Sequence, residues 1–283
     1  MTKSKGVLTM AQGHARYARL AVNLARSIRL RDPDLPLAVA TDLDPALFEG
    51  AFDHVIRWDF SRRSGFTSKL EAYAITPFEA TLLLDSDMLA YRSLSLVFEQ
   101  FEGDFFGVIR TTDPPEVVYG TLTRLRELFP EAHFPAFNGA LYYFVKNEKA
   151  AQLFQVASAR YEQYDELQLK RLHGQRNEEA LFGLAMAERG IMARPARRNG
   201  IVLGVWFPFG HRLVSDVVAG TCHQLEGNVC VSRVFLHYFG GSGGLTASHR
   251  YILSSCPYVL SGRFASPAKR GRRICRQNIW RLT

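Results

Sequence analysis

Two carboxylates, Asp85 and Asp87, stand one residue apart at the end of the apolar run "ATLLLDSDML" (80–89). An ionised carboxylate taken out of water is costly unless it is paired or bound to a metal ion. Carboxylates in this setting suit a hard divalent ion such as Mn²⁺ or Mg²⁺, which takes oxygen ligands and keeps positions for phosphate oxygens. The structural alternative is a strand that ends in an ordinary Asp-containing turn.

A third candidate ligand, His237, comes much later, near the end of the apolar segment "SRVFLHYF" (232–239). A glycine cluster that includes Gly240 and Gly243 follows at once. Glycines let backbone N–H groups approach phosphate oxygens closely. The pattern indicates an ion that holds a diphosphate, although a histidine in such a strand can also be a hydrogen-bonded core residue.

These residues need a scaffold, and the first half of the chain alternates strand-like and helix-like segments. Apolar runs predict strands at 6–11, 35–42, 54–58 and 80–85, and helical spacing predicts helices at 14–30 and 67–75. This alternation is typical of βαβ units, so we expect an α/β fold with a mostly parallel mixed central sheet flanked by helices.

Ligands of such sheets bind beyond the carboxyl ends of the strands, where the strand order reverses. Asp85 and Asp87 follow the fourth predicted strand, Asp42 ends the second, and Met10 and Ala11 end the first. Their common position predicts a binding site at this edge of the sheet.

The second half is less regular. We expect strands at 105–110, 136–147 and 232–239, with helices at about 147–161 and 177–189. Neither an internal repeat nor a linker marks a second domain. The sequence therefore predicts one domain over residues 1–261 and a basic tail over 262–283.

Charge is unevenly distributed along the 283 residues, whose net charge is +8. No Asp or Glu follows Glu226, and the segment from Gly262, "GRFASPAKRGRRICRQNIWRLT", carries seven Lys or Arg. The body is therefore about neutral, which argues against nucleic-acid binding. We expect the tail to meet something anionic, such as a membrane surface.

Location can also be predicted from composition. No apolar stretch approaches the roughly 20 residues of a membrane span, and the N-terminus lacks the apolar region of a secretory signal. We expect a cytoplasmic protein, held peripherally at the inner face of a membrane by its tail. The four widely spaced cysteines predict thiols without disulfides or a zinc site.

The sequence lacks the motifs of several other enzyme classes. The segment after the first strand, "AQGHARYARLA", has no G-x-G-x-x-G, and the chain has neither a P-loop nor a G-x-S-x-G. "DSDML" is superficially like the D-x-D-x-T of haloacid-dehalogenase-like phosphatases. That motif belongs on the first strand and has Thr where Leu89 stands, so this alternative is weak.

Six segments, taken in order over about residues 6–245, resemble the GT-A nucleotide-sugar glycosyltransferases, and among them glycosyltransferase family 8. They are the opening strand with its Tyr-bearing helix, "DPDLPLAVATD", "SKLEAYAITPFEATLLLDSDML", "FNGALYYF", "NEEALFGLA" and "HYFGGSGG". The resemblance implies a single Rossmann-like GT-A domain. It also implies metal-dependent transfer of a hexose from a nucleotide diphosphate sugar, a UDP-sugar, to an acceptor hydroxyl with retention of configuration.

The same resemblance implies roles for individual residues. Asp85 would contact the metal and the ribose, Asp87 would be the main metal ligand, and His237 the third. Glu178, Lys69 and Asn138 would be catalytic, with Lys69 near the diphosphate and the donor sugar, and Glu178 and Glu179 standing where the family has Asp-Gln. The residues expected to bind the donor are Met10, Ala11, Tyr17, Asp42, Lys69, Asp85, Ser86, Gly139, Glu179, Gly240 and Gly243. For Lys69 a solvated helix position, and for Tyr17 a core position, are the structural alternatives.

One departure from the family pattern follows His237, where Gly243 replaces a Lys that contacts the diphosphate and no Pro-Trp follows. Its charge would have to come from Arg250, His249 or the segment "SRRSG" (61–65). Two other functions stay open. One is a sugar-phosphate nucleotidyltransferase, which would have a Gly-rich, Arg-containing loop after the first strand. The other is a sugar-nucleotide or glycan-binding protein on a degenerate GT-A scaffold.

Overall fold

The computed structural model describes residues 4–195, 204–205, 213–226, 229–232 and 235–238, with side chains for 4–195 and 216–222. Its centre is a six-stranded sheet with the strand order β3-β2-β1-β4-β7-β6. The strands are β1 (Lys5–Ala11), β2 (Leu37–Thr41), β3 (His54–Arg57), β4 (Ala80–Leu84), β6 (Phe106–Gly107) and β7 (Leu141–Val145). The first four are parallel, and β7 runs antiparallel to both β4 and β6. The predicted mostly parallel α/β sheet is confirmed.

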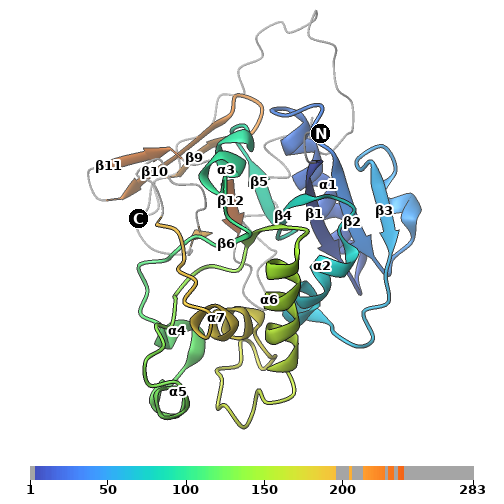
Figure 1. The fold of residues 1–283 in the computed structure, drawn as a ribbon. Helices are drawn as coiled ribbons and strands as arrows, with labels where there is room; N and C mark the ends of the chain where they lie inside the picture. The colour runs from blue at the N-terminus through green and yellow to red at the C-terminus, as the bar shows by residue number, and fades with distance from the viewer. Residues whose placement is uncertain (1–3, 196–203, 206–212, 227–228, 233–234, 239–283) are drawn as a thin grey trace, which may run out of the picture.

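Helices cover both faces of this sheet (Figure 1). On one face, α1 (Ala15–Arg29) and α3 (Ser95–Gln100) pack in a core with Val7 and Leu82. The other face holds Leu8 and Leu83 together with η2 (Gly65–Glu71), α2 (Ala72–Ile75), α6 (Glu148–Ala159) and α7 (Glu178–Ala187). Because neighbouring strand residues point to opposite faces, a strand buried on both must be apolar throughout.

Local sequence explains where the first helices begin. α1 starts at the predicted place because the side chain of His14 accepts a hydrogen bond from Arg16 N at 3.0 Å. The helix expected at 67–75 instead begins as a 3₁₀ segment, η2. There the hydroxyls of Thr67 and Ser68 donate to carbonyls three residues earlier, at 3.1 and 2.8 Å. Such side-chain bonds compete with regular α-helical pairing.

The strands of the second half are shorter than predicted. The segment expected at 136–147 becomes a strand only from Leu141, because Asn138 Oδ1 accepts from Ala140 N at 2.9 Å and closes a turn. β6 has two residues of the six expected. Short helices α4 (Glu116–Tyr119) and α5 (Thr123–Leu128) were not predicted, because four to six residues are too few for a periodic pattern.

Two small sheets flank the central one. β5 (Met88–Ala90) pairs with β12 (Phe235–Tyr238), which also pairs with β8 (Gly204–Val205). The strands β9 (Leu213–Asp216), β10 (Thr221–Glu226) and β11 (Val229–Ser232) form an antiparallel sheet. The strand expected at 232–239 corresponds to β12.

Several sequence expectations fall outside the described residues. They concern Gly240, Gly243, His249, Arg250 and the tail at 262–283. Among the helices that are described, none combines the length and the apolar character that crossing a bilayer requires.

Candidate active site

The order of the central sheet reverses between β1 and β4, because β2 and β3 lie on one side of β1 and β4 lies on the other. Thr9 Oγ1 donates to Leu84 O at 2.8 Å and holds the ends of these two strands together. Asp85, the next residue, donates its N–H to Ala140 O at 2.9 Å. The D-x-D segment therefore lies at the carboxyl edge of the sheet, at the switch point where α/β folds bind ligands.

Lys69 is the centre of the side-chain arrangement at this edge. Its ammonium lies 2.6 Å from Asp85 Oδ1 and 2.8 Å from Glu178 Oε1, and donates to Gly139 O at 2.7 Å. An ammonium has three N–H donors, and these three acceptors use all of them. Lys69 is buried, with 9% of its surface exposed, so it is not the solvated helix lysine that its sequence context also allowed.

Glu178 is the most enclosed carboxylate of the group, with 1% of its surface exposed. Besides Lys69, the phenol of Tyr142 approaches Glu178 Oε1 at 3.4 Å. The other oxygen, Oε2, is buried and finds no hydrogen-bond partner among the described residues. A buried acceptor without a donor is costly, and this one can accept a hydrogen bond from a ligand.

Gly139 is enclosed by the same glutamates. Its N–H donates to Glu179 Oε1 at 2.6 Å, and Asn177, the N-cap of α7, donates from its amide to Glu179 Oε2 at 3.3 Å. A Cβ atom at position 139 would lie 2.7 Å from both Glu179 Cγ and Tyr142 Oη, and 2.9 Å from Glu178 Oε1. Only glycine therefore fits between α7 and the start of β7.

Burial dominates the electrostatics of this cluster. It raises the pKa of Glu178 to about 7, with Glu179 and Asp85 adding repulsion and Lys69 opposing the shift. Burial raises the pKa of Glu179 as well, against the hydrogen bonds from Gly139 and Asn177. For Lys69, burial alone would lower the pKa, but Asp85 and Glu178 outweigh it and hold the pKa above its ordinary value.

The expected metal ligands occupy one region of the backbone. Asp85 and Asp87 are partly buried in the turn between β4 and β5. In the pairing of β12 with β5, His237 lies opposite Met88, the residue that follows Asp87 in the sequence. The side chain of His237 is not among those described, and the described side chains contain no group of three metal-binding residues.

The nucleotide-side candidates gather at the ends of β1 and β2. Met10 and Ala11 pair with Ala40 and Thr41, and Asp42 Oδ1 accepts from Gly13 N at 2.9 Å. Tyr17 is partly buried against the α1 core, and its ring lies 4.6 Å below the guanidinium of Arg16. The structure thus brings five of the predicted residues into one cluster of direct contacts: Lys69, Asp85, Gly139, Glu178 and Glu179. The nucleotide-side candidates lie beside this cluster, at the ends of the neighbouring strands β1 and β2. Ser86 and Asn138 lie in the two adjoining turns.

Sequence reasoning missed three contributors. Tyr142 lies against Glu178 and beneath Lys69, whose ammonium is 5.7 Å from its ring centroid. Asn177 caps α7, and the Asn before "EEALF" was the available signal for that cap. Gln12 donates to Ser68 Oγ at 2.9 Å and to Gly65 O at 3.2 Å. These bonds bring the "SRRSG" segment, which ends at Gly65, beside the end of β1.

No model of a known protein family matches the chain, and no curated protein matches it in sequence. Solved structures do match. Galactosyltransferase LgtC, in complex with donor and acceptor sugar analogues, aligns with a TM-score of 0.57 at 14% identity, over 93% of this chain and 97% of that one. An active-site Gln-to-Glu variant of LgtC aligns with a TM-score of 0.56 at 16% identity, over 94% and 99% of the two chains. The chain has the GT-A glycosyltransferase fold.

The GT-A fold agrees with the resemblance seen in the sequence, and the alignments extend over nearly the whole chain. At 14–16% sequence identity, the structural superposition establishes the architecture alone. The chemistry has to be argued from the residues at the switch point.

Proposed function

We propose that the chain transfers a hexose from a nucleotide diphosphate sugar, a UDP-sugar, to an acceptor hydroxyl, with the help of Mn²⁺ or Mg²⁺ and with retention of configuration. The observation that carries this proposal is the buried cluster of Lys69, Asp85 and Glu178 at the switch point of a GT-A fold. Buried charged groups are expensive, so a chain that keeps them at a ligand-binding edge points to function there.

Asp85, Asp87 and His237 would hold the ion. Carboxylate oxygens at the end of β4, and a histidine paired in register with Met88, fit a hard divalent cation in chemistry and in chain position. A bound ion would supply positive charge to the departing diphosphate, where the transition state needs it.

Lys69 acts mainly as a positioning residue in this scheme. Its three hydrogen bonds fix Asp85 at the end of β4, Gly139 before β7 and Glu178 at the start of α7. All its donors are engaged within the protein, so it would set the geometry of the carboxylates, at the position near the diphosphate and the donor sugar that the family resemblance implies. Other cationic side chains would also contact the diphosphate. The segment at 61–65 offers two arginines for this purpose and lies beside the end of β1.

Glu178 and the turn at Asn138 and Gly139 would contact the donor sugar. The unpartnered Glu178 Oε2 would accept a hydrogen bond from a sugar hydroxyl, because a ligand donor is what removes its desolvation cost. Glu179 holds the Gly139 N–H and so shapes the backbone on which the sugar would lie. Met10, Ala11 and Asp42 lie at the ends of β1 and β2, and Tyr17 lies in the first turn of α1, where the nucleotide would bind.

The acceptor would be a glycan or a lipid-linked saccharide. LgtC was solved with donor and acceptor sugar analogues together, and we infer the same two-substrate chemistry for this chain. The seven basic residues after Gly262 favour an acceptor presented at an anionic membrane surface, to which the enzyme would attach peripherally.

The test is a thermal-shift panel of nucleoside diphosphate sugars with and without Mn²⁺, followed by calorimetry on Asp87→Ala. We expect UDP-sugars to raise the melting temperature only with Mn²⁺, because a ligand that binds the folded state stabilises it. Asp87→Ala should keep its melting temperature and lose at least tenfold in Mn²⁺-dependent UDP affinity. The matched control is Asp34→Ala, which removes an exposed carboxylate in the turn before β2.

Unchanged Mn²⁺-dependent UDP affinity in Asp87→Ala would overturn the metal assignment. Turnover separates the remaining functions. A glycosyltransferase releases UDP from a labelled donor when acceptor is present, a nucleotidyltransferase forms or consumes pyrophosphate, and a binding protein does neither.

A further inference from the structure

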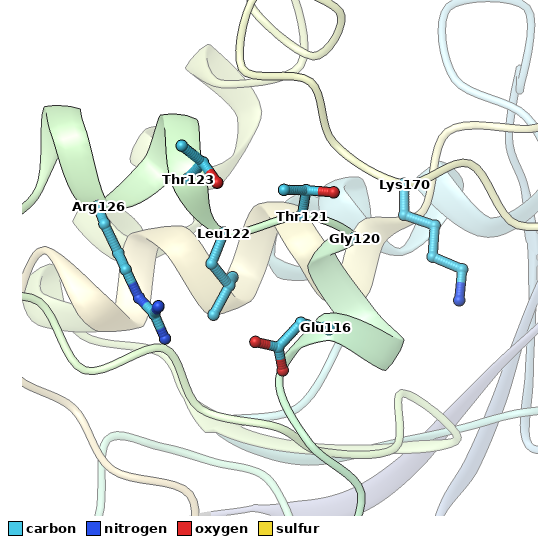
Figure 2. A pocket seen from close by; sticks show the side chains of 7 residues that line it. All are labelled: Glu116, Gly120, Thr121, Leu122, Thr123, Arg126 and Lys170. Carbon is cyan, nitrogen blue, oxygen red and sulfur yellow. The ribbon is translucent and has the colours of Figure 1, made fainter.

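A pocket of about 470 Å³ opens between α4, α5 and the segment at Lys170. Figure 2 shows Glu116, Leu122 and Arg126 converging on one space, with Lys170 beyond Gly120. Thr121 and Thr123 add hydroxyl groups to the lining. Its size lies within the range of pockets that take small ligands.

Of the three charged side chains of this pocket, one makes a hydrogen bond within the protein and two form no ion pair among the described residues. Neither Arg126 nor Glu116 forms an ion pair with any residue in the part of the chain that the structure describes. Lys170 donates from its ammonium to Val117 O at 3.1 Å, which uses one of its three donors. By contrast Arg124, two residues before Arg126 on α5, is paired with Glu127 at 3.2 Å.

Backbone geometry and hydrogen bonds fix the position of Gly120 against Lys170 in the lining of this pocket. Gly120 has φ +83°, a conformation that favours glycine, and a Cβ there would lie 3.2 Å from Lys170 Cβ. The Lys170 backbone is fixed on both sides, because its N–H donates to Tyr119 O at 2.9 Å and its carbonyl accepts from Tyr164 Oη at 2.5 Å. The pocket is thus built by defined contacts.

The same contacts lead to the switch-point cluster. Tyr164 Oη accepts from the N–H of Asn177, the cap of the helix that begins with Glu178. Tyr119 donates from its hydroxyl to Pro135 O at 2.8 Å, just before the turn that contains Gly139. Hydrogen bonds of Tyr119 and Tyr164 therefore connect the surroundings of the pocket to the elements that carry the proposed active site.

We propose that this pocket binds an anionic saccharide, a sugar unit that carries a phosphate or a carboxylate. Arg126 would take the anionic group and Glu116 beside it would bond to ring hydroxyls, while Lys170 would add positive charge at the far end of the pocket, beyond Gly120. Two cations against one carboxylate leave a net positive lining, which favours a ligand with a negative charge. The identification of this unit as part of the acceptor rests on the proposed glycosyltransferase function, whereas the binding itself does not.

The test measures binding of glucose 6-phosphate and glucuronate by calorimetry, with UDP and Mn²⁺ at saturation to fill the donor site. We expect glucose 6-phosphate to bind at least tenfold more tightly than glucose or inorganic phosphate. Arg126→Ala and the double variant Arg126→Ala/Lys170→Ala should each lose at least tenfold. Arg124→Ala, on the same helix, should bind as the unaltered chain does.

Three results would overturn the proposal: binding unchanged in the double variant, inorganic phosphate as tight as the sugar phosphate, or no binding of either probe. Asp87→Ala keeps the two proposals distinguishable. If it loses UDP and retains glucose 6-phosphate, both hold. If UDP never binds while glucose 6-phosphate does, only the glycosyltransferase function fails.

Discussion

Glu178 should take up a proton at higher pH than an ordinary glutamate, because it is buried beside Glu179 and Asp85 with one lysine to offset three carboxylates. Its pKa rises from 4.5 to about 7 on folding, so the folded chain binds the proton more tightly than the unfolded chain. Protonated Glu178 therefore raises the free energy of unfolding, by its full amount below pH 4.5. This contribution falls as pH rises and is lost as pH passes about 7. The shift corresponds to about 3 kcal/mol.

The measurement is urea denaturation of the unaltered chain and of Glu178→Gln between pH 4.5 and 8. Gln mimics the protonated form, so the unaltered chain should lose stability relative to the variant as pH rises, by up to about 3 kcal/mol. The exposed Glu162→Gln is the matched control and should show a flat difference. A flat difference for Glu178→Gln as well would refute the assignment.

At the scale of elements, Lys69 joins η2, the end of β4 and the start of α7. Lys69→Met would leave Asp85 and Glu178 buried without their cation, and breaking a buried ion pair costs about 3–5 kcal/mol. We expect a loss of that order in the free energy of unfolding, measured in urea at pH 7. Lys149→Met, at an exposed position on α6, should change it little.

A second variant tests the cause. Lys69→Met/Glu178→Gln removes one of the stranded carboxylates, so it should be more stable than Lys69→Met alone. If the double variant were the less stable of the two, the ion pair would not be the reason for the loss.

The sequence predicts the strands that end at the site better than it predicts the contacts within the site. β1, β2 and β4 are apolar runs because both their faces are buried, and that pattern is visible without a structure. The position of the D-x-D at a strand end follows from the same runs. The lysine cluster does not, because Lys69 and Glu178 are 109 residues apart and nothing local to either shows that they are buried together.

The short elements escaped prediction for a related reason. α4 and α5 have four and six residues, too few for a helical period, and they are held by tertiary contacts such as Lys170 N to Tyr119 O. The pocket between them therefore had no trace in the sequence. Gly139 was expected from its motif, but the glutamates and the tyrosine that require a glycine there became apparent only in the fold.

Across the whole molecule, charge divides the chain into a neutral body and a basic end. Deleting residues 262–283 should abolish binding to vesicles that contain anionic lipid and should spare Mn²⁺-dependent UDP binding. Each basic residue near an anionic surface contributes about 1 kcal/mol, so the attachment should weaken steeply with salt. The measurement is vesicle cosedimentation at low and high salt.

Neutral vesicles are the control and should bind neither form. If the full-length chain ignores anionic vesicles even at low salt, the membrane attachment is wrong. A soluble glycan or a protein would then be the better candidate acceptor.

Gly183 packs directly against the hydroxyl of Tyr119, and a Cβ at position 183 would overlap with Tyr119 Oη. The tyrosine hydroxyl also donates to Pro135 O, so shrinking Tyr119 to make room would deprive that carbonyl of its donor. Neither position can drift by single steps without passing through a defective intermediate. In the descendants of a common ancestor these two sites should therefore change together or not at all, and a library that randomises one of them alone should return almost only the parental residue.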